Sequence, residues 1–190
     1  MKQPRFFSTL KRAYEDRHHK RRELIGKTQN ALSRAKRSIF ALHRGDIDSA
    51  EALLQESEKL FKTVEKNFSR FPDLEFEGSY KAAKEEYAEA KLFRQFLLNG
   101  KFAKIDEARI DTESYIGGLA DATGEIVRYC LRQVTLGNAS VLPVCQDAVE
   151  MVNEYMLDLD LTGHLRSKFD QVKRNLRRLE EMSYDLAIRE

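Results

Sequence analysis

The stretch "YKAAKEEYAEAKLFRQFL", residues 80–97, decides the fold, because its apolar residues recur at the spacing of a helix. At 100° per residue these side chains form one stripe, with Glu86, Glu89 and Phe93 along its border. A helix with such a stripe must pack against other helices. The stripe consists of Tyr80, Ala83, Tyr87, Ala90 and Leu97.

The same spacing predicts helices on both sides of this stretch, and no segment has the alternation of a strand. Gly45 and Asp46 give a stop and an N-cap, and Pro143 is tolerable in a first helical turn. Because the linkers are short, we expect one all-α domain over residues 1–190, a bundle of six to seven helices with residues 1–13 as a flexible N-terminus. The expected helices span residues 14–43, 46–70, 78–99, 113–136, 140–158 and 162–188, and one further helical turn is expected in the connector 99–114.

Composition excludes several classes of protein. No apolar run is long enough to cross a membrane, and no h-region follows the first residues. The two cysteines, Cys130 and Cys145, give no disulfide framework, so a cytoplasmic location is expected. Zinc is disfavoured because Cys and His are not grouped, and no glycine-rich nucleotide loop is present.

Charge is distributed unevenly. Residues 1–44 hold 13 Lys and Arg against 3 Asp and Glu, whereas the remainder holds 20 against 28. A basic first helix on an acidic body indicates an anionic partner, with nucleic acid first, although a solvated basic helix face explains the excess equally well.

Two pairs of acids carry the chemistry. Glu86 and Glu89 are three residues apart, and Asp121 and Glu125 are four apart, so each pair projects from one side of its helix. If the two helices pack side by side, the four carboxylates converge, and their repulsion raises their pKa values. A divalent cation would relieve that repulsion, and oxygen-only ligands favour Mg²⁺ or Mn²⁺. The competing interpretation is that these are ordinary boundary residues, half solvated or paired with Lys and Arg such as Arg128.

The second of these helices has small residues beside its acids. Gly117, Gly118 and Gly124 lie near the side of Asp121 and would let another backbone approach closely. A di-iron site is set aside, because none of the four histidines completes a Glu-x-x-His motif. The apolar stripe of this helix consists of Tyr115, Leu119, Ala122, Ile126 and Tyr129.

The last helix carries a seam with alternating steps of four and three residues, interrupted at Ser183. Internal core is the default interpretation of this seam, and a subunit interface is the alternative. Its members are Leu165, Phe169, Val172, Leu176, Leu179 and Leu186.

Four stretches resemble the translin and TRAX family. "DRHHKRRELIGKTQNALSRAKRSIFALHR" resembles its first helix, "EEYAEAKLFRQFL" its acidic helix, and "SYIGGLADATGEIVRYCLRQV" its DLTGE-containing helix. "KFDQVKRNLRRLEEMSYDLAIRE" resembles its C-terminal helix. The resemblance is closest to TRAX, covers nearly the whole chain from about residue 15, and departs at Ala122, where TRAX tends to have Leu.

This resemblance implies a translin-like bundle that assembles into a hollow octamer around RNA, and a Mg²⁺-dependent endoribonuclease. It implies that Glu86, Glu89, Asp121 and Glu125 are the catalytic metal ligands. The compact chain predicts a prokaryotic-type homo-oligomer that works alone, with a translin-like protein partner as the alternative.

The leading interpretation is therefore a Mg²⁺- or Mn²⁺-dependent endoribonuclease for single-stranded RNA, with one unassigned carboxylate as general base. Two alternatives stay open: a non-catalytic translin-like protein that binds RNA or single-stranded DNA, and a helical scaffold that binds a protein through its last helix. The basic residues expected to hold the RNA backbone are Arg17, His18, Lys20, Arg21, Arg34, Lys36 and Arg37.

Overall fold

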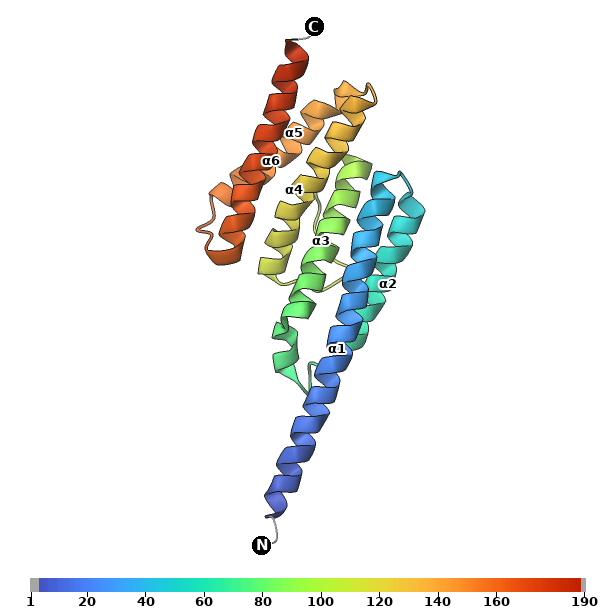
Figure 1. Cartoon of the computed structure of the whole chain (residues 1–190), viewed down its shortest axis with the longest axis vertical. Coiled ribbons are helices and arrows are strands. Elements are labelled where there is room, and N and C mark those ends of the chain that lie inside the picture. The colour runs from blue at the N-terminus through green and yellow to red at the C-terminus, as the bar shows by residue number, and fades with distance from the viewer. Residues whose placement is uncertain (1–3, 189–190) are drawn as a thin grey trace.

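The structure is a computed structural model that describes residues 4–188. Within that range every element of regular secondary structure is a helix, so the predicted all-α class is confirmed. None of the helices described combines the length and the apolar character that a membrane span requires. Figure 1 shows the α-helices α1 (Arg5–His43), α2 (Ile47–Glu65), α3 (Gly78–Asn99), α4 (Thr112–Thr135), α5 (Leu142–Leu157) and α6 (Gly163–Ala187); the 3-10 turns are η1 (Pro72–Phe76) and η2 (Ala139–Val141).

Helix ends follow the local signals in the sequence. Gly45 has a φ of 80°, which glycine adopts readily, and it separates α1 from α2. Asp46 caps α2 by accepting a hydrogen bond from the Ser49 amide at 3.1 Å. Pro143 lies in the first turn of α5, where its missing N–H costs nothing. These predictions are confirmed.

Two helix boundaries and one connector differ from the sequence prediction. Helix α1 begins at Arg5 instead of residue 14, so residues 5–13, predicted as a flexible N-terminus, continue the helix; residues 1–3 lie outside the described range. Helix α2 ends at Glu65 instead of residue 70, because the chain turns there before Pro72. The connector at residues 101–111 contains no helical turn.

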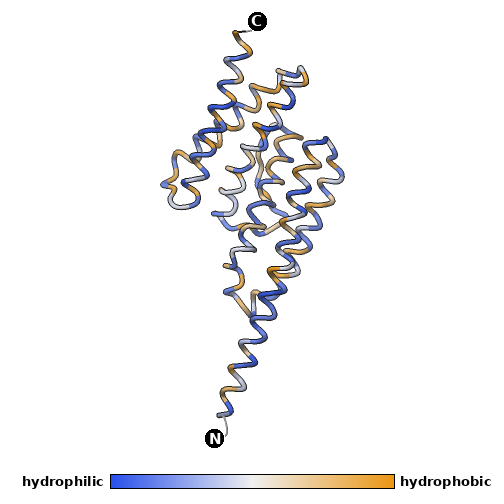
Figure 2. The backbone as a smooth tube through the Cα atoms, viewed as in Figure 1, coloured by the Kyte–Doolittle hydropathy of each residue, from blue (hydrophilic) through white to orange (hydrophobic). Residues whose placement is uncertain are grey.

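The helices form an elongated bundle with α3 and α4 at its centre. Helix α1 packs against α2 and α3, α3 packs against α4, and α4 packs against α5 and α6. The start of α1 and the end of α6 project from opposite ends of the bundle (Figure 1). Hydrophilic residues dominate the projecting part of α1 (Figure 2). The centre of the bundle is therefore where side chains from several helices lose contact with water.

Helix α3 is buried on more sides than its sequence indicated. The predicted stripe from Tyr80 to Ala90 is buried, but Phe93, predicted at the border, is fully buried as well. Two lysines are also inside: Lys84 donates to Glu65 at 2.7 Å, and Lys91 donates to Glu107 at 2.6 Å. Burial of these charges is tolerable because each has a carboxylate partner.

The seam of α6 is internal core along its middle. Phe169, Val172 and Leu179 are buried against α4 and α5, as the default interpretation predicted. Leu165, Leu176 and Leu186 are only partly buried. Asn175 fixes α6 to α4 through a hydrogen bond from its Nδ2 to Thr123 Oγ1, at 2.8 Å.

Helices α3 and α4 touch through their backbones at Gly118. A Cβ built on Gly118 would lie 2.6 Å from Ala88 Cβ, 2.7 Å from the Glu85 carbonyl oxygen and 2.8 Å from the Glu89 amide nitrogen. These neighbouring atoms cannot move aside easily, because two of the three belong to the backbone of α3. The predicted role of the small residues in α4 is therefore confirmed at Gly118.

Replacing Gly118 with Ala should lower the free energy of unfolding by about 1–3 kcal/mol, because α3 and α4 must separate to admit the methyl group. The matched control is Gly26→Ala in α1, which meets nothing within 4 Å and should gain about 0.5–1 kcal/mol in helix propensity. Urea unfolding of both variants measures the difference. Equal stabilities for the two variants would contradict the close contact.

Candidate metal centre

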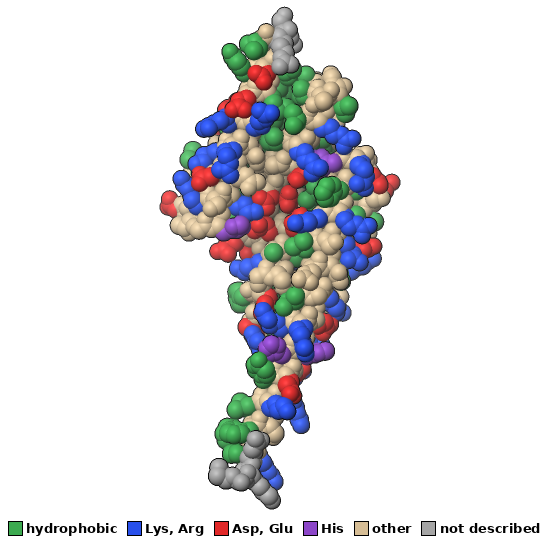
Figure 3. Space-filling view, viewed as in Figure 1, with side chains coloured by type: hydrophobic (Ala, Val, Ile, Leu, Met, Phe, Trp, Pro, Cys, Tyr) green, Lys and Arg blue, Asp and Glu red, His purple; other side chains and the backbone are tan. Residues whose placement is uncertain are grey.

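The four predicted carboxylates lie on the packed sides of α3 and α4. Glu86 and Glu89 come from α3, and Asp121 and Glu125 come from α4. All four are partly buried, with 17% of the Glu86 side chain, 20% of Asp121 and 21% of Glu125 exposed. Figure 3 shows acidic side chains gathered at the middle of one face, with Lys and Arg side chains on both sides. We call these four residues the acidic quartet.

Glu89 is the most perturbed member of the quartet. Burial raises its pKa most, and the neighbouring carboxylates Glu86, Asp121 and Glu125 raise it further, to about 9. Of the largest influences on this pKa, only that of Lys168 lowers it, and within the described residues Glu89 has no hydrogen bond that favours its charged form. At neutral pH the metal-free protein therefore holds Glu89 protonated.

The other three acids each have a cationic or histidine partner. Burial raises the pKa of Glu86, although the Lys36 ammonium group, 3.6 Å away, acts to lower it. Burial also raises the pKa of Asp121, although Asp121 accepts a hydrogen bond from Lys168. The competing interpretation, in which these acids pair with Lys and Arg, is therefore met in part, and its example, Arg128, lies 3.5 Å from Glu125.

Glu125 is hydrogen-bonded to His43, which sequence reasoning did not select. The His43 side chain is 6% exposed, and its ring lies against Phe93 with 4.8 Å between centroids. Arg132 donates to the His43 carbonyl oxygen and fixes the end of α1 against α4. No local signal marks His43, because its partner is 82 residues away in the chain.

The donor set suits a hard divalent cation, since it consists of carboxylate oxygens that repel one another. Within residues 4–188, however, no three His, Cys, Asp or Glu side chains are placed to hold one ion together. Lys168 and His43 occupy the carboxylates of Asp121 and Glu125 instead. The quartet thus offers only oxygen ligands, and Asp121 and Glu125 would have to exchange these partners before they could hold an ion.

Most of the residues predicted to bind RNA already contact acids of the same chain. Five of the seven form ion pairs with carboxylates. Lys36 pairs with Glu86 of the quartet, and the other four pairs hold α1 to α2, to the turn before α3, or to itself. Their charge is therefore partly neutralised. The other four pairs are Arg17–Asp73, Lys20–Glu23, Arg21–Glu77 and Arg34–Glu56.

The remaining predicted residues differ from one another. His18 is half-buried beside the Tyr14 ring, with 4.6 Å between ring centroids. Lys36 and Arg37 are exposed, and Lys36 borders the acidic quartet. The structure therefore places only Lys36 of this set at the candidate metal centre.

Further cationic residues were missed. A shallow cavity of about 300 Å³ is lined by Glu86, Glu89 and Glu125 and by Lys36, Arg128, Ile39 and Phe40. The Arg128 guanidinium lies 5.4 Å from the centre of the Phe40 ring, which is half exposed. Helix α6 adds a basic exposed face that its i, i+4 spacing could have revealed: Arg166, Lys173, Arg174, Arg177 and Arg178.

Comparison with known proteins gives one family. The model of the translin family matches residues 19–190. Translin-associated protein X of Pongo abelii and of Rattus norvegicus are each 25% identical to the chain, over 96% of it and 78% of their own length.

Solved structures share the fold. Apo-NeC3PO superposes with a TM-score of 0.85 and 23% identity, covering 95% of this chain and 97% of the other. AfC3PO superposes with a TM-score of 0.80 and 25% identity over the same shares of both chains. A complex of AfC3PO with duplex RNA superposes with a TM-score of 0.85 and 22% identity, again over 95% and 97%.

The raised pKa of Glu89 makes stability depend on pH. Between the ordinary value of 4.5 and about 9, folded Glu89 holds a proton that the unfolded chain releases, so the free energy of unfolding falls as pH rises through this window. Glu89→Gln should flatten that fall, and its advantage over the native chain at pH 9 should reach the order of 2 kcal/mol, since partial solvation screens the repulsion.

Urea unfolding in EDTA from pH 5 to pH 9 tests this dependence. The control is Glu113→Gln, whose carboxylate on α4 is 74% exposed and should leave the pH profile unchanged. Parallel profiles for native protein and Glu89→Gln would show that Glu89 is ionised in the folded state.

Proposed function

The chain belongs to the translin family, and we propose that it is a Mg²⁺- or Mn²⁺-dependent endoribonuclease that works within an oligomeric assembly. One observation carries the proposal: Glu89 lies buried beside three other carboxylates and lacks a cation of its own within the described residues. Such an arrangement is costly in a protein without a ligand for it. The resemblance of the acidic stretches to TRAX supports the same assignment.

In this proposal the acidic quartet holds the ion and a carboxylate orients the attacking water. A bound ion would supply Lewis-acid stabilisation of the charge that develops on the phosphate. A carboxylate of the quartet would accept the proton of the water, whose oxygen forms the new bond to phosphorus as the bond to the leaving oxygen breaks, and the leaving oxygen would take a proton from solvent. Lys36 and Arg128 line the same cavity and are placed to bind the flanking phosphates.

The substrate in this proposal is single-stranded RNA. Phe40, half exposed beside the quartet, offers a face for one unpaired base, and base–aromatic stacking tolerates any sequence. The AfC3PO complex contains duplex RNA, so a duplex of matched sequence is the second substrate to compare. Free, buried Cys130 and Cys145 fit the reducing cytoplasm, in which we place the protein.

The assembly in this proposal is a homo-octamer. Large apolar side chains stand exposed at the two projecting ends: Phe6, Leu10 and Tyr14 on α1, Tyr184 on α6 and Ile188 directly after α6. A single chain leaves these side chains in water, and their burial against further subunits stabilises an oligomer. A translin-like partner protein could supply the same contacts, and light scattering of the purified chain separates the two arrangements.

Glu89→Gln should reduce cleavage of a short single-stranded RNA in Mg²⁺ by at least about 100-fold, because metal catalysis contributes several kcal/mol. RNA binding should persist, since the substitution adds no negative charge and leaves the basic residues in place. Glu89 is the best member of the quartet to change, because its loss leaves no lysine or histidine without its partner. Single-turnover cleavage and filter retention measure the two effects.

The control for this experiment is again Glu113→Gln, which should cleave like the native protein. Chelation by EDTA should abolish cleavage in both. If Glu89→Gln cleaves normally, Glu89 is not part of the catalytic centre. If the native protein binds RNA without cleaving it in any divalent cation, the non-catalytic RNA-binding function replaces the proposed one.

Arg37→Ala should reduce the salt dependence of RNA binding by about one unit of slope, because an exposed arginine on α1 releases one counterion per phosphate contact. Arg34→Ala is the matched control on the same helix: Arg34 Nε already lies 2.5 Å from Glu56, so its loss should change the slope less. Binding measured from 50 to 200 mM salt gives both slopes. Equal slopes for Arg37→Ala and native protein would remove this part of α1 from the RNA-binding surface.

A further inference from the structure

Lys168 bridges α6 to both central helices beside the acidic quartet. It lies on α6, with 14% of its side chain exposed, and it donates to Asp121 on α4. Its Nζ also lies 2.9 Å from Glu85 Oε1 on α3. Burial alone lowers the pKa of Lys168, but these two carboxylates raise it above the ordinary value, so the group is charged.

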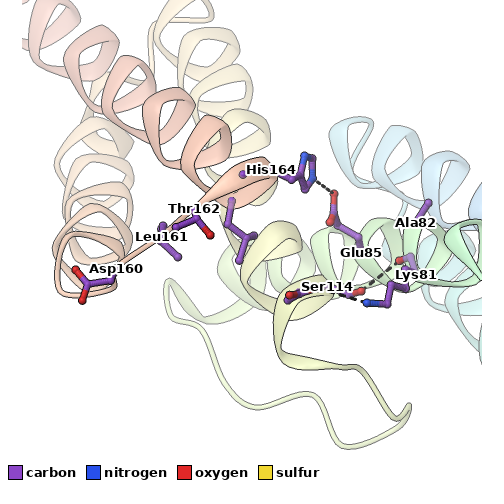
Figure 4. A pocket seen from close by; sticks show the side chains of 11 residues that line it. Lys81, Ala82, Glu85, Ser114, Asp160, Leu161, Thr162 and His164 are labelled. Atoms are coloured by element: carbon purple, nitrogen blue, oxygen red, sulfur yellow. Dashed lines mark hydrogen bonds and ion pairs between the residues drawn. The ribbon is translucent and has the colours of Figure 1, made fainter. Parts of the chain in front are cut away.

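Glu85 is a carboxylate outside the quartet, and it is held in place. It packs over Gly117 of α4, where a Cβ would lie 2.7 Å from Glu85 Cδ. Its Oε1 also lies 3.5 Å from His164 Nε2 at the start of α6, and Figure 4 shows the two side chains pointing toward each other beside a cavity of about 650 Å³. Lys168 therefore has one acceptor inside the quartet and a second, fixed acceptor at its edge.

The charge of Lys168 reaches beyond its two direct partners. It opposes the rise in pKa of Glu86 and of Glu89 as well as that of Asp121. Among the largest influences on the pKa values of these three acids, Lys168 is the cation that they share. A cation bound by the quartet would compete with Lys168 for the Asp121 carboxylate, whose Oδ2 accepts the hydrogen bond from Lys168.

We propose that Lys168 is a built-in counter-ion that neutralises the quartet in the metal-free protein and transfers from Asp121 to Glu85 when a divalent cation binds. This inference rests on the proposed function, because it requires the quartet to hold the ion. Lys168 is a positioning residue here: it keeps the empty centre folded, and it lowers the affinity for the ion by competing for Asp121. Glu85 offsets that competition by accepting the displaced ammonium group.

Two substitutions should change cation affinity in opposite directions. Lys168→Met removes the competitor, so Mn²⁺ should bind about tenfold more tightly, while the metal-free protein should melt at a lower temperature. Glu85→Gln removes the second acceptor and leaves Lys168 on Asp121, so Mn²⁺ should bind about tenfold more weakly. Lys168→Gln serves in place of Lys168→Met if that variant does not fold.

The double variant Lys168→Met with Glu85→Gln separates displacement of Lys168 onto Glu85 from a direct effect of the Glu85 charge. If Glu85 acts by accepting Lys168, Glu85→Gln should weaken Mn²⁺ binding only in chains that retain Lys168. If Glu85 acts by its charge alone, it should weaken binding equally with and without Lys168. The control for loss of a positive charge on α6 is Lys173→Met, an exposed residue paired with Asp170, which should leave Mn²⁺ affinity unchanged.

Calorimetric titration of the full chain with Mn²⁺, beside melting curves in EDTA, reads out all variants without any nuclease assay. If the native chain binds Mn²⁺ and Glu89→Gln does not, the quartet is the site. If the native chain does not bind Mn²⁺, the proposed function is overturned. Given that binding, the inference is overturned if Lys168→Met leaves the affinity unchanged, or if Glu85→Gln has the same effect in both backgrounds.

Discussion

The contact between the α3 and α4 backbones at Gly118 is the constraint on which the rest of the centre depends. Because the two helices touch there, carboxylates at the contact and within about two turns of it share a partly buried space. Their burial and mutual repulsion raise the pKa values of Glu86, Glu89 and Asp121. A wider separation of the helices would admit water between the acids and remove both effects.

Neighbouring helices offset this repulsion only in part. Lys36 and His43 reach the quartet from α1, and Lys168 reaches it from α6. Glu89 has no such partner, and burial together with the neighbouring carboxylates raises its pKa to about 9, which favours its protonated form in the metal-free centre. A site kept in this state trades stability for a function, which is the expected sign of a ligand-binding centre.

The sequence predicted the features that depend on spacing along one helix. The stripe of α3, the seam of α6 and the two acid pairs all follow from steps of three and four residues. It did not predict Lys168 or His43 as partners of the quartet, because the residues in these two contacts are 47 and 82 positions apart in the sequence and lie on different helices. The first turns of α1 escaped prediction for a related reason: they project from the bundle and bury no apolar stripe.

The distribution of charge also explains why an acidic centre can serve a polyanion. Exposed arginines and lysines on α1 and α6 lie on the two sides of the quartet, so they can hold phosphates at a distance from it. A phosphate directly above the quartet meets repulsion until a cation is bound between them. In the proposed function, binding of the ion and binding of that one phosphate must therefore favour each other by the same factor. The basic flanks then set the affinity for RNA, and the quartet sets whether the bound strand reacts.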